Sequence, residues 1–406
     1  MPRFTYQARD RVGQLVVGVL EGPDDRTVAA TLSRQGYQPV RIQRQGSSTR
    51  RLDALLFWKR HRVDRQEVLI LFRELAALLR AGIPLATSLD GAIQQTQTAA
   101  LRQTLGHVAR DVQGGASLSE AMSKYPEVFP ELFISMVRVG EVAGILDQVL
   151  EQLAQLGTQE LETRSKIQAA FLYPMVLVGF ALVVVTVLLV GVLPQFISVF
   201  EASKVSLPLP TKVLLGLSGI VRRFWWFLLS ACGGGVWWVR RYYETPKGRW
   251  RIDRLFLALP LIGILYRKLL IARIARILGA MLKTGVPLLE ALTVVEKTVP
   301  NVVFQRTLQR TRSAVAEGQS LADPWTASGL FPPLVLQLVS VGERTGQLDV
   351  MLDEVTTFYD PEIELTIRNL TTLLEPALLM IMGLLVGFIA LSVLLPIFQL
   401  IHVFRR

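Results

Sequence analysis

The sequence predicts a mainly α, polytopic membrane protein with two duplicated cytoplasmic all-α helical-bundle domains, three transmembrane helices and a small N-terminal α+β domain. Three observations predict this class. Hydrophobic residues make up 51% of the 406 residues, and the mean hydropathy is +0.39, above that of an ordinary soluble mixture. Two long runs carry no charged residue, and one set of motifs returns 202 or 203 residues further along. An ordinary soluble globular protein is therefore excluded.

Residues 1–44 form the first predicted unit, a small cytoplasmic domain. Apolar side chains at Phe4, Tyr6 and Ala8 alternate with polar ones, as in a strand with one buried face. The other elements that the pattern favours are strands over 15–20 and 40–42 and a helix over 25–35. A unit this short has little core of its own.

Residues 45–63 are predicted to be a linker. Within it, the apolar stretch Leu52–Trp58 is followed by the basic run Lys59–Arg62. Such a basic amphipathic segment either lies on an anionic membrane face or docks on a partner. A short surface helix that joins two domains accounts for the same pattern.

A tandem duplication is the strongest signal in the chain. The segment AGIPL at Ala81–Leu85 returns as TGVPL at Thr284–Leu288, and VGEVAGILD at Val139–Asp147 returns as VGERTGQLD at Val341–Asp349. A register that is constant to one residue over more than 100 positions indicates one repeated unit, a helical domain followed by a span. The two copies of the helical domain are predicted over residues 64–170 and 241–372.

In each copy, the first of these segments is predicted to end one helix and to start the next. Glycine adopts a left-handed cap conformation at little cost, and proline pre-sets the backbone of a first helical turn. The residues in these positions are Gly82 and Pro84 in the first copy and Gly285 and Pro287 in the second.

The second repeated segment, Gly-Glu-x-x-Gly-x-Leu-Asp, has two interpretations. Its glycines permit a tight interhelical turn while its carboxylates accept the free amide hydrogens at the start of the next helix. Alternatively, its acidic side chains bind a lysine or arginine of a partner protein. The residues are Gly140, Glu141, Gly144 and Asp147 in the first copy, and Gly342, Glu343, Gly346 and Asp349 in the second.

The predicted transmembrane helices cover residues 171–195, 223–240 and 373–401, and a periplasmic loop covers 196–222. The first and third lie in the uncharged runs Ile167–Phe200 and Pro376–Phe404, and each run exceeds the roughly 20 residues that cross the hydrocarbon core. The second is shorter and crosses only if the long side chains of Arg222 and Arg240 reach the interface.

Basic residues near the span ends predict the orientation. Nine lie on the side that carries the two large polar regions, and six lie on the other side. The positive-inside rule therefore places the N-terminus and both helical domains in the cytoplasm, and three spans then place the C-terminus on the outer side of the membrane. The N-terminal segment lacks the basic and apolar pattern of a cleavable signal, so the internal spans are expected to direct the chain to the membrane.

The sequence offers no enzyme constellation. The three histidines, His61, His107 and His402, lie in different predicted regions, and Cys232 is the sole cysteine, so no metal cluster or catalytic triad can be placed. The net charge of +11 divides into +3, +3, +3 and +2 along the chain, which leaves no basic domain for nucleic acid. The spans hold few polar side chains, so a small-solute transporter is only a distant alternative. A membrane-bound scaffold or coupling protein is predicted.

Several segments, in order along nearly the whole chain, resemble a known family. They are FTYQARDRVG at the start, FRELAALLRAGIPL at Phe72–Leu85, LSEAM at Leu118–Met122, both Gly-Glu-x-x-Gly turns, Tyr173-Pro174 and LPLPT at Leu207–Thr211. With these segments the sequence resembles the inner-membrane protein F of bacterial type II secretion systems (GspF), a family that includes the type IV pilus platform protein PilC. The opening and the LPLPT segment resemble the secretion branch more than the pilus branch.

The resemblance implies a function, that of a non-enzymatic assembly platform in the bacterial inner membrane. Such a platform couples a cytoplasmic secretion ATPase to pseudopilus assembly and to the export of folded proteins. The implied partners are the ATPase (GspE-like), its membrane anchors (GspL/GspM-like), pseudopilins (GspG-like), the lipid bilayer and further copies of the chain in a homo-oligomer, with no nucleic acid. A type IV pilus biogenesis platform (PilC-like) is the alternative.

The resemblance also bears on a metal site. In this family a calcium ion is attributed to the first cytoplasmic domain, held by a helix glutamate and a carboxylate four residues further on. Here Glu151 matches the first position, Gln155 replaces the second, and Gln97 offers a third oxygen. Calcium prefers six to eight oxygens with several negative charges, so the replacement weakens the site. An ordinary solvated helix face without a cofactor is expected instead.

Overall fold

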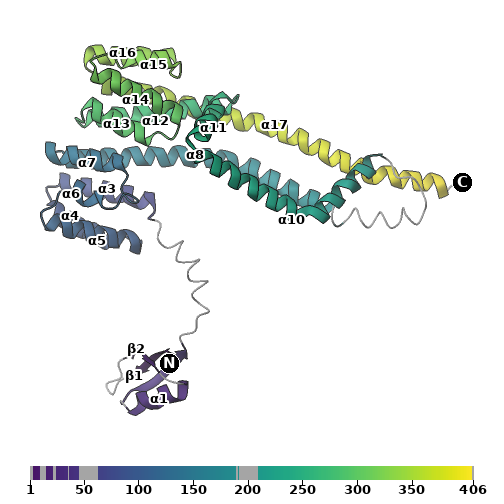
Figure 1. Ribbon diagram of the computed structural model, residues 1–406, viewed down its shortest axis with the longest axis horizontal. Helices are drawn as coiled ribbons and strands as arrows, with labels where there is room; N and C mark the ends of the chain where they lie inside the picture. Colours follow the sequence, from purple (N-terminus) through teal and green to yellow (C-terminus); the bar gives the residue numbers. More distant parts are fainter. Residues whose placement is uncertain are drawn as a thin grey trace. The chain divides into compact units, whose positions relative to one another are not determined.

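The computed structural model describes residues 3–9, 15–21, 24–34, 36–44, 63–188, 191 and 209–404. These residues are mainly helical and divide into two compact units, one formed by Met1–Asp64 with Thr98–Ala100 and one by the rest of the chain (Figure 1). The predicted amphipathic stretch within the linker lies outside the described residues. Residues 196–208 of the predicted periplasmic loop lie outside them as well.

The first unit contains a three-stranded antiparallel sheet and one helix. Its elements are β1 (Arg3–Arg9), β2 (Leu15–Glu21), α1 (Asp25–Arg34) and β3 (Gln38–Arg44). Strand β1 is central, between β2 and β3. Helix α1 contributes the buried Val28 and Leu32, which pack against Leu20. The helix is capped by Asp24, whose carboxylate accepts the Thr27 amide hydrogen at 2.8 Å.

The first helical repeat opens the second unit. Its helices are α3 (Arg65–Arg80), α4 (Leu85–Gln95), α5 (Ala99–Gln113), α6 (Leu118–Ser123), α7 (Glu131–Ala143) and the first part of α8 (Leu146–Val187). Leu71, Phe72 and Leu75 recur on one face of α3 and are buried, as expected for an amphipathic helix. The Phe72 ring lies 6.2 Å from Phe129 and 5.3 Å from Phe133 between centroids, which places an aromatic cluster in this core.

The second helical repeat has the same order of helices. They are α12 (Ile262–Lys283), α13 (Leu288–Thr298), α14 (Val302–Ala316), α15 (Ala322–Ser328), α16 (Pro333–Thr345) and the first part of α17 (Leu348–Phe404). Its core also holds an aromatic cluster, because Phe331 stacks on Trp325 at 4.1 Å and meets Phe304 edge-on at 5.6 Å. The two repeats therefore have the same design with different side chains in their cores.

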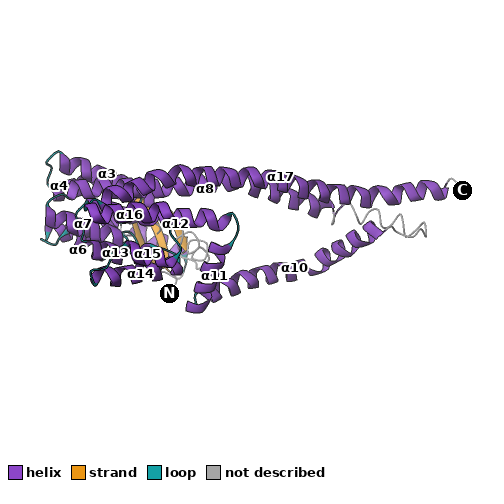
Figure 2. Cartoon of the chain, turned by 90° about the horizontal axis from the view of Figure 1, so that it is seen from above, coloured by secondary structure: helices purple, strands orange, loops and turns teal. Residues whose placement is uncertain are grey.

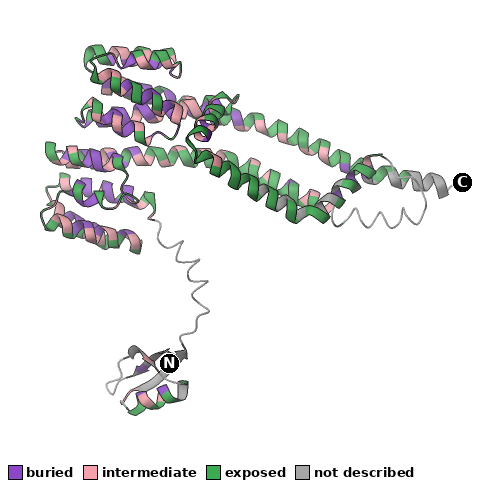
Figure 3. Ribbon diagram, in the orientation of Figure 1, coloured by how far each residue is buried: buried purple, intermediate pink, exposed green. Residues whose placement is uncertain are grey.

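Helices α8 and α17 continue from the helical repeats into long apolar extensions (Figure 2). Segments Leu146–Val187 and Leu348–Ser392 are each long and apolar enough to cross a bilayer. Their extensions expose apolar side chains, among them Leu182 at 63% and Leu384 at 70% (Figure 3). The domain boundaries predicted at residues 170 and 372 therefore lie inside continuous helices, because a helix need not end where its surface changes from polar to apolar.

Helix α10 (Leu209–Tyr243) contains the predicted second span, residues 223–240. It is interrupted at Phe224, whose backbone angles are not helical (φ −118°, ψ 18°). It is not among the described helices that are long and apolar enough to span alone. The predicted loop also differs from the structure, because its residues 209–222 are helical. Leucine favours this helix, and Pro210 lies in the first turn, where proline is tolerated.

Helix α11 (Pro246–Ala258) follows α10 and meets α12 at a bend of 108°. The pair would count as a third spanning element if it were one broken span. However, Leu270, Ile274 and Leu278 of α12 are at most 2% exposed, because α12 packs along α17 within the second helical repeat. Helix α12 therefore belongs to the helical repeat.

Candidate functional site

The repeated Gly-Glu segment ends α7 in the first repeat and α16 in the second. Gly144 and Gly346 follow these helices with left-handed backbone angles, φ 72° and 71°. The next amide in each turn, that of Ile145 or Gln347, donates to the carbonyl oxygen five residues back at 2.9 Å. This is a Schellman closure, and it requires the positive φ that glycine tolerates. The same turn therefore connects α7 to α8 and α16 to α17.

The first glycine of each segment has a different role from its predicted one in the turn. Gly140 and Gly342 lie within helices, are buried, and do not have positive φ. A Cβ at Gly140 would lie 2.8 Å from Val149 Cγ2, and one at Gly342 would lie 2.9 Å from Leu348 Cα. The absence of a side chain thus allows α7 to approach α8, and α16 to approach α17, more closely than alanine would permit.

The glutamate of each segment caps a short helix. Glu141 accepts the amide hydrogens of Leu118 and, at 3.1 Å, of Ser119 at the start of α6. Glu343 accepts the Leu321 amide hydrogen at 2.8 Å before α15. These carboxylates do accept hydrogen bonds from free amides, as predicted. The amides belong to a helix earlier in the chain, however, whereas the prediction was the start of the following helix. Tertiary packing, which brings the start of α6 against α7, determines this choice.

The final aspartate of each segment lies in the first turn of the following helix. Asp147 belongs to the first turn of α8 and Asp349 to that of α17. A negative side chain in this position interacts favourably with the helix dipole. Both aspartates are half-buried. The glutamates, in contrast, form the contact to a helix earlier in the chain.

The helix-turn glycines and prolines lie at the junctions where the sequence predicted them. Gly82 after α3 and Gly285 after α12 have φ values of 81° and 84°. Pro84 and Pro287 directly precede α4 and α13, each with φ −56°. These junctions, like the Gly-Glu turns, have equal geometry in both repeats.

Glu151, the glutamate considered for calcium, lies beside a positive charge and an amide donor. Glu151 on α8 lies 3.8 Å from the Arg80 guanidinium and accepts a hydrogen bond from the Gln155 amide at 3.2 Å. A divalent cation would have to displace the positive charge of Arg80 and would meet an amide donor on the other side. Gln97, in the loop between α4 and α5, adds only a neutral amide. Among the described residues, no group of three His, Cys, Asp or Glu is placed to hold a metal ion.

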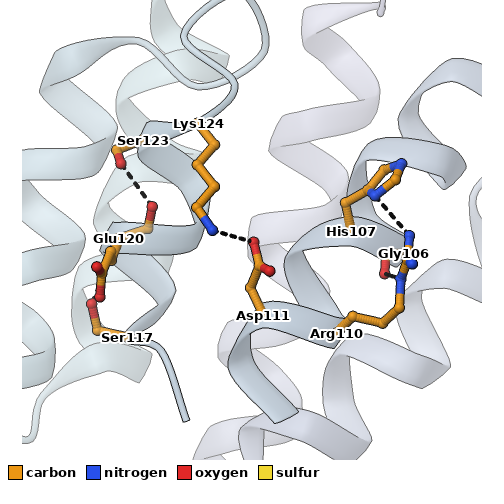
Figure 4. A network of polar contacts seen from close by, with 8 residues as sticks. All are labelled: Gly106, His107, Arg110, Asp111, Ser117, Glu120, Ser123 and Lys124. Carbon is orange, nitrogen blue, oxygen red and sulfur yellow. Dashed lines mark hydrogen bonds and ion pairs between the residues drawn. The ribbon is translucent and has the colours of Figure 1, made fainter. Parts of the chain in front are cut away.

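A surface network in the first repeat includes His107, one of the three histidines (Figure 4). Arg110 donates to His107 Nδ1 at 2.7 Å, and Lys124, the residue after α6, pairs with Asp111 of α5 at 3.0 Å. The hydrogen bond and the charge of Asp111 raise the pKa of Lys124 above its usual 10.5. The Lys124–Asp111 pair connects the end of α6 to α5, whereas the Arg110–His107 contact lies within α5. His61 and the side chain of His402 lie outside the part of the chain that is described.

The contact between the two repeats was not predicted from the sequence. Ion pairs join Lys297 of α13 to Glu131 of α7, Arg273 of α12 to Glu160 of α8 at 3.3 Å, and Lys166 of α8 to Glu364 of α17 at 3.3 Å. Arg273 and Glu160 also line a mainly apolar pocket of about 470 Å³ between α7, α8, α12 and α17. The paired residues occupy non-equivalent positions of the repeat, so comparison of the two copies gives no signal for them.

The comparisons with known proteins agree with this repeated architecture. The family "Type II secretion system (T2SS), protein F" matches twice, at residues 71–194 and 274–396, which confirms the predicted duplication. The family "Type II secretion system protein F, N-terminal domain" matches residues 1–43.

Full-length relatives come from both branches of the resemblance. The chain is 36% identical to the type IV pilus assembly protein PilC of Thermus thermophilus, over 99% of this chain and 98% of that protein. It is 34% identical to the type II secretion system protein F of Pseudomonas aeruginosa, over 98% and 99% of the two chains, and 32% identical to that of Vibrio cholerae over 100% of both. The chain therefore belongs to the type II secretion system protein F family.

Proposed function

We propose that this chain is an inner-membrane assembly platform of a type II secretion system, which couples a cytoplasmic secretion ATPase to pseudopilus assembly and to the export of folded proteins. The double family match across both helical repeats is the observation that carries this proposal. The architecture supports it, because two polar helical repeats offer surfaces for a motor and the exposed apolar helices α8 and α17 offer surfaces for lipid or pseudopilin helices.

Helix α10 is proposed as the third span. The contact of the two repeats through Lys297 and Glu131 supports their placement on the same side of the membrane. A chain that leaves through α8 must then return before α12, and α10 is the long described helix between them. Exposed Trp237 and Trp238 followed by Arg240 are typical of a membrane interface and support this assignment.

The cytoplasm is proposed as the side that holds the N-terminal unit and both helical repeats, with the C-terminus in the periplasm. The excess of basic residues at the ends of the spans next to the helical repeats supports this orientation. The ATPase and its membrane anchors then bind the cytoplasmic surfaces, pseudopilins contact the spans, and further copies of the chain form a homo-oligomer.

Purification of the tagged full-length chain from membranes of its host tests the proposal. We expect a secretion ATPase and pseudopilins to copurify, and a deletion strain to retain exported proteins in the periplasm. An untagged strain is the control for non-specific capture. If neither a motor nor a pseudopilin is recovered and export is normal in the deletion strain, the proposed function is wrong.

The second candidate is a platform for type IV pilus assembly. It is favoured by the identity of 36% to a pilus assembly protein, two percentage points above the 34% to a secretion protein F. The same purification separates the two candidates. Recovery of a pilus ATPase and pilin, together with loss of surface pili in the deletion strain, would assign the chain to the pilus branch.

A further inference from the structure

Helix α11 and its corner with α12 form an element that the repeat does not account for. The second family match begins at residue 274, after this corner. Among the described residues, Leu261 in the corner is the one non-glycine residue with a positive φ, 66°. This backbone turns the chain by 108° between α11 and α12. The corner is thus a sharp turn that carries a leucine at a position where glycine is the usual residue.

The corner exposes a cluster of large apolar side chains. Leu255 and Phe256 at the end of α11 are 62% and 47% exposed, and Leu261, Ile262 and Ile264 are 48%, 49% and 54% exposed. These five exposed apolar side chains lie within ten residues of one another in the chain, and a concentration of this kind is typical of an interaction site. None of these five side chains is buried by another part of the described chain.

Basic side chains accompany this apolar cluster. Lys247, Arg251 and Arg254 of α11 are exposed, and Arg254 lies over the Trp250 ring at 5.2 Å. The one acidic residue of α11, Asp253, is 2% exposed and occupied by internal hydrogen bonds, so it does not offset this charge at the surface. The surface is therefore apolar and positively charged, which complements an anionic lipid interface.

The position of α11 is continuous with the membrane helix proposed above. Helix α11 lies at the end of the helical repeats from which α10 departs (Figures 1 and 2). On the adjoining end of α10, Trp238 stacks on Tyr242 at 5.6 Å, and exposed Trp237 lies beside them. Aromatic side chains of this kind gather at the level of the lipid headgroups.

We propose that α11 and the α11–α12 corner form a membrane-interface anchor. In it, Leu255, Phe256 and Ile264 enter the headgroup region, and Lys247, Arg251 and Arg254 bind the phosphates of anionic lipids. The occupant is thus the anionic lipid surface itself. This inference rests on the proposed placement of α10 in the bilayer.

A buried carboxylate fixes the anchor to the second repeat. Asp253 accepts the Val302 amide hydrogen of α14 at 2.8 Å and the Tyr243 hydroxyl hydrogen of α10 at 3.1 Å. Asn301, fully buried, donates to the Asp253 carbonyl at 3.3 Å and caps α14. Because α10, α11 and α14 are connected in this way, lipid contacts of α11 also determine the tilt of the second repeat relative to the membrane.

Environment-sensitive fluorophores on single cysteines of the full-length chain in lipid nanodiscs test the anchor. In a Cys232→Ser background, labels replace Leu255 or Ile264, with Val236 of α10 as the lipid control and Val142, 87% exposed in the first repeat, as the aqueous control. We expect labels at 255 and 264 to be blue-shifted and quenched by nitroxide-bearing lipids, like the label at 236 and unlike that at 142.

The controls separate the possible failures. If 255 and 264 report water while 236 reports lipid, the anchor is wrong and the span assignment of α10 stands. If 236 also reports water, the topology under the proposed function fails together with the anchor. If the labels at 255 and 264 are instead quenched by labels on a second copy and not by lipid, the surface is a self-association site and the anchor is overturned.

The charged part of the anchor has its own test. In nanodiscs that contain both phosphatidylglycerol and phosphatidylcholine, the double variant Arg251→Gln, Arg254→Gln should lose preference for phosphatidylglycerol near the labelled corner, by roughly fivefold for each basic side chain. The matched control is Arg306→Gln with Arg310→Gln, two exposed arginines of α14. An unchanged preference in the α11 variant, or an equal loss in the control, would contradict phosphate binding by α11.

Discussion

Glu141 and Glu343 lie 202 residues apart in the chain, yet each carboxylate binds the amide of a leucine at the start of a short helix, Leu118 in the first repeat and Leu321 in the second. Each glutamate therefore connects the end of one helix, α7 or α16, to the start of another, α6 or α15. The shared contact explains the repeated glutamate without a partner protein, because a free amide at a helix start needs an acceptor.

Replacement of the first of these glutamates should lower stability. In Glu141→Gln one carboxylate oxygen becomes an amide donor that faces a backbone N–H, so one charge-assisted hydrogen bond is lost. We expect the free energy of unfolding to fall by about 1 to 3 kcal/mol. Glu343→Gln should have a smaller effect, because Glu343 is exposed and Glu141 is half-buried. Thermal unfolding of the detergent-solubilised chain measures both.

The control for this substitution is Glu127→Gln, an exposed glutamate between α6 and α7. The Glu127→Gln variant should be as stable as the wild type, since exposed charges contribute little to the free energy of unfolding. The alternative interpretation, in which Glu141 binds a lysine or arginine of a partner, predicts a different outcome. A Glu141→Gln protein that keeps full stability and loses export would support that interpretation and would contradict the cap.

The repeated turns could be predicted from the sequence, whereas their long-range contacts could not. Glycine and proline restrict the local backbone, so the positions of Gly82, Gly144 and their equivalents follow from residue type alone. The acceptor role of Glu141 depends on a helix 23 residues earlier, which only tertiary packing brings near. A usable signal was nevertheless present, since Ser117-Leu118 recurs as Ser320-Leu321 in nearly the same register as the glutamates.

The buried helical glycines should not tolerate alanine. In Gly140→Ala the new Cβ would lie 2.8 Å from Val149 Cγ2, and in Gly342→Ala it would lie 2.9 Å from the Leu348 backbone. Such overpacking costs about 1 to 3 kcal/mol. Gly342→Ala should be the more destabilising, because backbone moves less easily than a side chain. Unfolding temperatures of the two variants provide the comparison.

Gly106→Ala is the matched control for these glycines. Gly106 also lies within a helix, α5, but a Cβ there would have no neighbour within 4 Å. Alanine should therefore be neutral or should stabilise the helix by up to about 1 kcal/mol. Equal destabilisation at all three positions would show that close packing is not the reason for the two repeated glycines.

The ends of the domains and spans were the least predictable part of the fold. A change from polar to apolar side chains marks where α8 leaves the helical repeat. Because the residues on both sides of this change favour a helix, the helical backbone continues through it without a break. Similarly, nothing local in Lys297 or Glu131 shows that they pair, because the contact depends on how the two repeats pack.

The ion pair between Lys297 and Glu131 should contribute to the contact between the repeats. Both side chains are more than half exposed, so the expected coupling is about 0.2 to 1 kcal/mol. Glu131→Lys alone places two positive charges together, and Lys297→Glu in the same chain restores opposite charges. A double-mutant cycle on the unfolding free energy measures the coupling. If the changes in unfolding free energy of the two single variants simply add in the double variant, with no recovery of stability, the ion pair makes no contribution.

The pair of Lys124 and Asp111 should make stability depend on pH in the alkaline range. Asp111 raises the pKa of Lys124 in the folded protein above 10.5, so its stabilisation is complete below pH 10.5 and is lost as the pH rises through the raised pKa. The difference in unfolding midpoint between the wild type and Asp111→Asn should therefore narrow above pH 10.5. Asp90→Asn is the control, because Asp90 accepts hydrogen bonds from the uncharged Gln113. If the difference for Asp111→Asn stays constant across this range, the ammonium of Lys124 does not carry the interaction.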